Sequence, residues 1–247
     1  AYGRGNRRTE TGMSTSDWQP ASGPGADARR ASKKQRIRAK YASAHVLEED
    51  TPDLSTYAVS DPQIESLEIT RCQVSGRPLY LQTSPEFCMK RLLAADYPDI
   101  YSMGHVFRDG ESGRLHQPDF TMLEWYRLGM ALEEIVSDTV GVISAALDRY
   151  IDVDTVDYRD AFIAACGLDP FVADIASLAD GDGAVDALRA AVGDERDDWR
   201  DLFLATRVTA QFEPEHLKVL RQYPASQAAL ARLGPDDNRV ADRFEVF

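Results

Sequence analysis

The stretch from residue 105 to residue 127 constrains the fold more than any other part of this chain. Residues 119–127 alternate in the way of a strand with two different faces. One face carries Phe120, Met122, Glu124 and Tyr126, and the other carries Thr121, Leu123, Trp125 and Arg127. The preceding segment, residues 109–118, contains two glycines and a proline, which are too many breakers for a helix. This stretch therefore predicts two strands joined by a loop.

The surrounding segments predict a mixed α+β fold. Ser84-Pro85-Glu86 opens a helix, because Ser84 is a favourable N-cap and proline is favoured at the first helical position. Amphipathic spacing predicts a long helix over about residues 131–150. We expect four parts along the chain: a disordered segment (1–30), a core (31–152), a helical insertion (153–220) and a return to the sheet of the core (221–247).

Charge and cysteine content exclude several classes of protein. The 247 residues carry a net charge of −13 at pH 7, which argues against general nucleic-acid binding through a basic surface. The three cysteines, Cys72, Cys88 and Cys166, are scattered, so neither a zinc site nor a disulfide framework is predicted. No apolar run approaches the roughly 20 residues that cross a bilayer, so we expect no membrane segment and a cytoplasmic location.

Two carboxylates near the predicted strands suggest a site for a cationic substrate. Glu124 and Tyr126 share a face with Phe120, and Glu86 begins the preceding helix. A partly buried carboxylate needs a positive partner to offset its desolvation, so this set suits a substrate with two amino groups. The pattern by itself also fits a solvated glutamate and a core tyrosine.

Arg108 stands where the first strand ends and the loop begins. A guanidinium in this place suits a bidentate clamp on a carboxylate and a phosphate. The alternative is a surface arginine paired with Asp109 or Glu111. His116, in the same loop, suits a hydrogen bond to a phosphate oxygen, although histidines in loops are commonly just exposed.

Several runs of residues resemble one family. Leu81–Ala95 and Val106–Tyr126 are similar to the lysyl-tRNA synthetase group of class II enzymes. Glu124-Trp125-Tyr126-Arg127 and Tyr223–Ala228 resemble more closely the short paralogues of that group, the elongation factor P–(R)-β-lysine ligases. The resemblance implies an antiparallel sheet flanked by helices, with residues 31–152 as a catalytic core that contains motifs 1 and 2.

The resemblance also implies roles for individual residues. Arg108 would be the catalytic arginine of motif 2, which binds the α-phosphate of ATP and the substrate carboxylate. The substrate-binding residues would be Ser84, Glu86, Glu124 and Tyr126. The ATP-binding residues would be Arg108, Asp109, Gly110, Glu111, His116, Gln117 and Phe120. Glu245 would bind ATP-linked magnesium, and motif 1, with Pro52, would form a homodimer interface.

Three positions depart from the pattern of the family. Gly110 stands where motif 2 usually has a glutamate, and Glu111 follows one place later. Gln117 replaces a common asparagine, and His45 stands where the lead-in to motif 1 usually has glycine. The sequence ends before motif 3, so we expect a fold that is incomplete at its C-terminal end.

The implied activity uses ATP and Mg²⁺ to activate (R)-β-lysine or lysine as an adenylate and transfers it to a lysine of elongation factor P. A lysyl-tRNA synthetase would carry an anticodon-binding barrel of roughly a hundred residues ahead of this core. Only a short low-complexity segment stands in that place, which favours the protein acceptor. The alternatives are a catalytic fragment of a lysyl-tRNA synthetase and a non-catalytic class II-like binding module.

Overall fold

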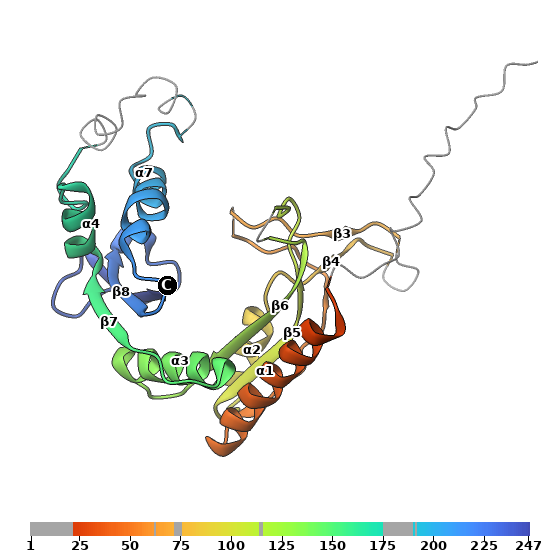
Figure 1. Cartoon of the computed structure of the whole chain (residues 1–247). Coiled ribbons are helices and arrows are strands. Elements are labelled where there is room, and N and C mark those ends of the chain that lie inside the picture. The colour runs from red at the N-terminus through yellow and green to blue at the C-terminus, as the bar shows by residue number, and fades with distance from the viewer. Residues whose placement is uncertain (1–21, 62, 72–75, 114–115, 175–189, 191) are drawn as a thin grey trace, which may run out of the picture.

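A computed structural model describes residues 22–61, 63–71, 76–113, 116–174, 190 and 192–247. The fold is α+β (Figure 1). Its helices are α1 (Pro24–Ser43), α2 (Glu86–Leu93), α3 (Leu132–Leu147), α4 (Tyr158–Cys166) and α7 (Arg196–Phe203). Its strands are β1 (Leu47–Glu48), β2 (Leu54–Ser55), β3 (Glu68–Ile69), β4 (Leu79–Leu81), β5 (Ile100–Phe107), β6 (Asp119–Tyr126), β7 (Val153–Asp157), β8 (Leu217–Pro224) and β9 (Val240–Val246).

The strands form three sheets, in the orders β1-β5-β6, β2-β4-β3 and β7-β8-β9. Strands β5 and β6 pair antiparallel from Ile100↔Tyr126 to Phe107↔Asp119, which confirms the predicted strand–loop–strand unit. Strands β8 and β9 are also antiparallel, whereas β1 pairs with β5 and β7 with β8 in parallel. The β1-β5-β6 and β7-β8-β9 sheets therefore each contain an antiparallel pair of strands with one parallel neighbour.

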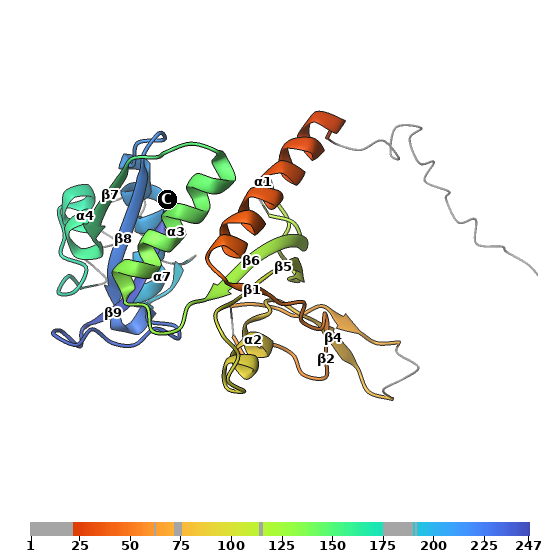
Figure 2. The ribbon, with the colours of Figure 1, turned by 90° about the horizontal axis from the view of Figure 1, so that it is seen from below.

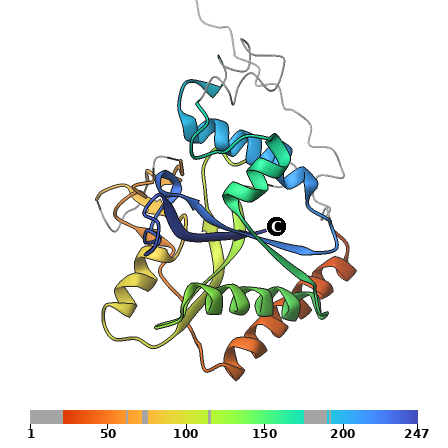
Figure 3. The same ribbon diagram turned by 90° about the vertical axis from the view of Figure 1, so that its left-hand side faces the viewer.

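One face of the β5–β6 hairpin is covered by α1 and α3, which pack against each other (Figures 2 and 3). Tyr41 of α1 stacks on Tyr101 of β5 with ring centroids 4.4 Å apart. Leu123 and Trp125 of β6 pack on the same cluster together with Val142 of α3. Leu123 and Trp125 belong to one of the two faces predicted from the alternation, so this face of β6 is the one that packs against α1 and α3.

A second core joins α4 and α7 to strand β8. Aromatic rings dominate it, and Tyr158, Phe162, Trp199 and Phe203 are all fully buried. Tyr223 of β8 lies 4.9 Å from Tyr158, measured between ring centroids. Figure 2 shows α3 between this part of the molecule and the β5–β6 hairpin with α1.

The structure corrects two of the expected boundaries. Residues 24–30 belong to α1, so this part of the expected disordered segment is helical, because a proline at its first position and a basic amphipathic run favour a helix. Residues 1–21 of that segment, and Cys72, lie outside the described residues. The expected helical insertion (153–220) begins with strand β7, and β8 already starts at Leu217, because these two strands pair with each other.

Gly110 and His45, two of the positions that depart from the expected pattern, both have a positive φ. Gly110 has φ of 73°, a left-handed conformation that glycine adopts without steric cost. A glutamate at this position would be strained. His45, which stands in place of the usual glycine, has φ of 56° and joins α1 to the strand that follows. Glycine, the residue expected here from the resemblance, adopts this left-handed conformation without steric cost.

Candidate active site

The face of β6 opposite Leu123 and Trp125 holds a carboxylate between two hydroxyl groups. Ser84 Oγ donates a 2.6 Å hydrogen bond to Glu124 Oε2, and the Tyr126 hydroxyl donates a 2.7 Å hydrogen bond to Glu124 Oε1. Glu124 and Tyr126 are half-buried and lie on one face of the strand, as their spacing predicts. Each carboxylate oxygen is therefore fixed in direction and still has room to accept a further donor.

Helix α2 brings a second carboxylate to the same place. The backbone N–H of Glu86 donates a 3.1 Å hydrogen bond to Ser84 Oγ, so this one hydroxyl joins the start of α2 to Glu124. The helix begins at Glu86 with Pro85 as its N-cap, one residue later than predicted from Ser84 as N-cap and Pro85 as the first helical residue. Glu86 Oε1 itself lies 2.6 Å from Lys90 Nζ, one turn further along α2.

The negative charges of Glu124 and Glu86 affect the pKa of Tyr126. Burial raises the pKa of the Tyr126 phenol above its ordinary value, and the hydrogen bond to Glu124 and the charges of Glu124 and Glu86 raise it further. The phenol therefore stays protonated and acts as a donor at neutral pH. We call Ser84, Glu86, Glu124 and Tyr126 the amine end of the candidate site, after the ligand group that the sequence predicts for them.

Arg108 lies at the other end of the hairpin and is anchored on three sides. Its Nε donates a 3.2 Å hydrogen bond to the carbonyl of Thr83, the residue before Ser84. Its guanidinium lies over the Phe120 ring at 5.4 Å from the centroid, and Nη1 is 3.5 Å from Glu111 Oε1. Only this last contact belongs to the alternative interpretation of a paired surface arginine, and it is long. The guanidinium plane is thus oriented by Thr83 and Phe120.

The loop after Arg108 is built from backbone contacts. The Arg108 N–H donates to the Pro118 carbonyl at 2.9 Å, and the Gly113 N–H donates to the His116 carbonyl at 3.0 Å. Gln117 Nε2 lies 3.4 Å from the Gly113 carbonyl oxygen. The predicted ATP-binding residues Asp109, Gly110, His116 and Gln117 are exposed here, next to Arg108, Glu111 and Phe120. We call these seven residues the nucleotide end of the candidate site, after the ligand that the sequence predicts for them.

Glu245 stands apart from both ends. It lies on β9, in the β7-β8-β9 sheet, and pairs with Arg243. Among the residues that the structure describes, no group of three or more His, Cys, Asp or Glu side chains is placed to hold a metal ion. Magnesium commonly uses only one or two carboxylates together with phosphate oxygens, so a single Glu245 fits a partial ligand and no more.

Sequence reasoning missed two residues that shape the site. The carbonyl of Thr83 accepts a hydrogen bond from Arg108 and orients it, and Lys90 forms an ion pair with Glu86. The spacing of Glu86 and Lys90, four positions apart on a predicted helix, was a usable signal for the second. No side-chain pattern indicates the first, because a backbone carbonyl makes the contact.

Comparison with known proteins identifies the class of protein to which this chain belongs. A model of the class II tRNA synthetases for D, K and N matches residues 28–243. Because it covers most of the chain, the chain belongs to this family. The matched range contains both ends of the site and all five described helices other than the first turn of α1.

Similar proteins of known name point to one group within this family. The chain is 35% identical over 237 residues to the elongation factor P–(R)-β-lysine ligase of Photorhabdus laumondii, covering 94% of this chain and 73% of the relative. It is 35% identical over 242 residues to the protein of the same name from Vibrio cholerae, covering 95% and 74%. The Yersinia pestis protein is 35% identical over 240 residues, covering 94% and 73%. With the family, these relatives make the protein an ATP-dependent ligase.

Within the described ranges, no helix combines enough length with enough apolar character to cross a bilayer.

Proposed function

We propose that the protein activates (R)-β-lysine or lysine as an adenylate and transfers it to a lysine side chain of elongation factor P. The observation that carries the proposal is the arrangement of Glu124, fixed by Ser84 and Tyr126, on the hairpin that also carries the oriented Arg108. The names of the relatives supply the acceptor, because each is an elongation factor P–(R)-β-lysine ligase.

At the amine end, Glu124 and Glu86 would hold the two ammonium groups of the substrate. A half-buried carboxylate favours a cation strongly because its own desolvation is then offset. The Tyr126 and Ser84 hydroxyls keep both oxygens of Glu124 in place before the substrate arrives. The substrate ammonium would take Glu86 in place of Lys90, whose exposed ion pair is weak.

At the nucleotide end, Arg108 would bring the substrate carboxylate and the α-phosphate together. A carboxylate oxygen attacks the α-phosphorus of ATP, the bond to the bridging oxygen breaks, and pyrophosphate leaves. The arginine neutralises charge that gathers on the α-phosphate oxygens, and its fixed plane makes this stabilisation available without rearrangement. Phe120, which lies under Arg108, would stack near the adenine, and the loop with His116 and Gln117 would contact the phosphates.

In the second step, the neutral amine of a lysine in elongation factor P attacks the carbonyl carbon of the adenylate. An amide bond forms, the bond between the carbonyl carbon and the phosphate oxygen breaks so that AMP leaves, and the attacking amine releases a proton to solvent. The net charge of −13 fits a protein acceptor better than a nucleic acid. As part of the same proposal, Glu245 would supply one carboxylate to Mg²⁺ held mainly by the phosphates. We also place the reaction in the cytoplasm.

A homodimer through the motif 1 region completes the proposal. A cavity of about 530 Å³ lies beside Pro52, Leu54, Tyr57 and Phe87. The side chains of Leu54, Tyr57 and Phe87 are 48%, 78% and 54% exposed, and polar residues that include Ser55, Gln82 and Ser84 line the same cavity. Covering it with a second copy would remove large apolar groups from water.

The test is ATP–pyrophosphate exchange by the full-length protein with lysine, (R)-β-lysine and norleucine, which lacks the side-chain amine. We expect exchange with one or both of the first two and none with norleucine. Transfer of the labelled amino acid to elongation factor P, but not to lysine tRNA, supports the proposed acceptor. Charging of tRNA instead would favour the lysyl-tRNA synthetase alternative, and no exchange with any of the three would end the enzyme proposal.

A further inference from the structure

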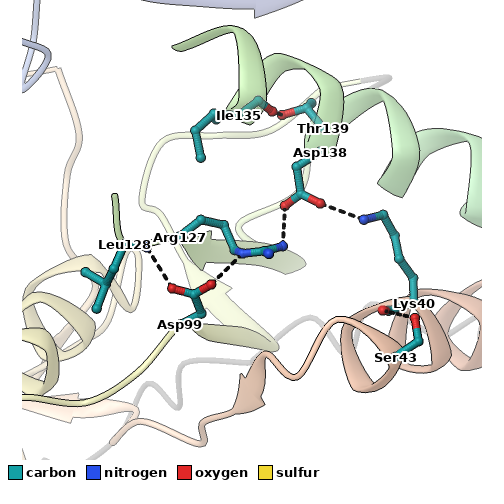
Figure 4. Close-up of polar contacts among 8 residues, drawn as sticks. All are labelled: Lys40, Ser43, Asp99, Arg127, Leu128, Ile135, Asp138 and Thr139. Carbon is teal, nitrogen blue, oxygen red and sulfur yellow. Dashed lines mark hydrogen bonds and ion pairs between the residues drawn. The ribbon is translucent and has the colours of Figure 1, made fainter. Parts of the chain in front are cut away.

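Arg127, the residue directly after Tyr126, lies within a chain of charged side chains on the buried side of the hairpin (Figure 4). Its Nε is 2.8 Å from Asp99 Oδ2, and its Nη1 is 3.1 Å from Asp138 Oδ2. The side chains of Arg127 and Asp138 are only 10% and 8% exposed. An ion pair this enclosed is costly to break, because removing one partner leaves the other charge buried and unpaired.

The chain of charges continues beyond Arg127. Asp138 Oδ1 lies 2.6 Å from Lys40 Nζ, and Asp99 Oδ1 accepts a 2.7 Å hydrogen bond from the Leu128 N–H. The two carboxylates and two cations balance each other. They come from α1, from the residue before β5, from the residue after β6, and from α3, as Figure 4 shows. This network therefore fixes four elements at one point.

That point lies at one end of the hairpin only. In the β5–β6 pairing, Ile100 faces Tyr126 next to the network, whereas Phe107 faces Asp119 next to the loop. Seven residue steps separate the two ends of β6, or about 23 Å at the rise of an extended strand. The network therefore adjoins the amine end of the site and lies at the opposite end of the hairpin from the loop that follows Arg108.

We propose that Arg127 is a positioning residue for the amine end of the site, an inference that rests on the proposed function. Successive strand residues point to opposite faces, so the clamp of Asp99 and Asp138 on Arg127 sets where Tyr126 and Glu124 point on the other side. The 2.7 Å contact between the Tyr126 hydroxyl and Glu124 depends on that setting. Loosening the clamp weakens the binding of the substrate amines without disturbing the nucleotide end.

This role has a kinetic signature that a general loss of stability lacks. An interaction that binds substrate and transition state equally changes KM and leaves kcat unchanged. We therefore expect Arg127→Met and Asp138→Asn to raise KM for the amino acid by about tenfold, with kcat and KM for ATP each within about twofold of the wild type. Arg127→Lys keeps the charge but loses the planar guanidinium that reaches two carboxylates. Its KM for the amino acid should therefore lie between that of the wild type and that of Arg127→Met.

Arg36→Met is the matched control. Arg36 also joins α1 to α3, through 2.9 Å hydrogen bonds from Nε to the Ala145 carbonyl and from Nη2 to the Ala146 carbonyl, and these bonds reach α3 and not β6. It should lower the melting temperature as the Arg127 variants do, yet leave KM for the amino acid unchanged. Kinetics are measured by ATP–pyrophosphate exchange at a temperature where every variant remains folded by circular dichroism.

The outcomes separate this inference from the proposed function. No amino-acid-dependent exchange in the wild type overturns the proposed function and the inference with it. Wild-type exchange, with Arg127→Met and Asp138→Asn both retaining the wild-type KM for the amino acid, overturns the inference alone. An equal rise of both KM values, or a rise that Arg36→Met reproduces, likewise shows that the network only stabilises the fold. If Arg127→Met does not fold, Arg127→Lys and Asp138→Asn decide.

Discussion

The hydroxyl of Tyr126 donates a 2.7 Å hydrogen bond to Oε1 of Glu124, two residues earlier on the same strand face. The two side chains come from one strand, so how the end of β6 is held determines whether they stay in contact. This hydrogen bond makes Glu124 a rigid acceptor, which is what selective binding of an ammonium group requires.

Replacement of Glu124 by glutamine should remove the charge and keep the shape. The amide oxygen can still accept one of the two hydroxyl bonds, so we expect the melting temperature to change little. Loss of a charge-assisted hydrogen bond to the substrate amine should raise KM for the amino acid by about a hundredfold or more. Exchange kinetics with varied amino acid measure the effect. An unchanged KM would remove Glu124 from the substrate site.

The two Arg108 variants test charge against geometry. Arg108→Ala removes both, and we expect the exchange rate to fall by about a thousandfold or more, as for other groups that stabilise developing charge. Arg108→Lys keeps the charge but cannot donate to Thr83 and clamp two oxygens at once, so it should recover only a small part of the rate. Near-normal exchange by Arg108→Ala would contradict the catalytic assignment, and circular dichroism verifies that both variants fold.

Much of the site was predictable because its signals are local. The alternation over residues 119–127 separated the face with Glu124 and Tyr126 from the face with Trp125 and Arg127, and the structure confirms this separation. The start of α2 followed from Ser84 and Pro85 for the same reason. In each case neighbouring residues determine the backbone, so a short window of sequence contains the information.

What could not be predicted depends on contacts between distant residues. Lys40 and Asp138 are 98 positions apart, and Asp99 and Arg127 are 28 apart, so no window contains the network. Strand β7 was missed because a five-residue run with two aspartates resembles a loop until β8, about sixty positions later, pairs with it. The division into three sheets is likewise a property of pairing and not of the separate strands.

Gly110→Ala should affect the nucleotide end alone. A Cβ at this position would meet no atom within 4 Å, so the substitution causes no clash, and its cost is the left-handed φ of 73°. That conformation costs roughly 1–2 kcal/mol for a residue with a side chain, and the exposed loop can relax to escape it. We expect KM for ATP to rise while KM for the amino acid stays unchanged, the reverse of the Arg127 variants. Exchange kinetics with varied ATP measure this.

Strong alkali should unfold the protein through its buried tyrosines. Burial raises the pKa of Tyr41, Tyr158 and Tyr223 above the ordinary value of 10.0, and each ring is at most 1% exposed. An unfolded tyrosine loses its proton near pH 10.0, whereas the folded one retains it, so their stabilising effect is complete below that pH and declines above it. Each group can add up to about 1.4 kcal/mol of destabilisation per pH unit.

Tyr158→Phe isolates one of these groups. The Tyr158 hydroxyl is buried and has no hydrogen-bond partner among the described residues, so its removal ends a desolvation cost. We expect the free energy of unfolding in urea to be equal to that of the wild type or up to about 1 kcal/mol higher at pH 8, since the phenyl ring keeps its 5.1 Å stacking on Phe162. Between pH 10 and pH 11.5 the variant should lose stability more slowly than the wild type, because one fewer proton separates the folded and unfolded chains. Parallel slopes for the two proteins over that range would show that Tyr158 ionises as readily in the fold as in the unfolded chain, and would contradict its burial.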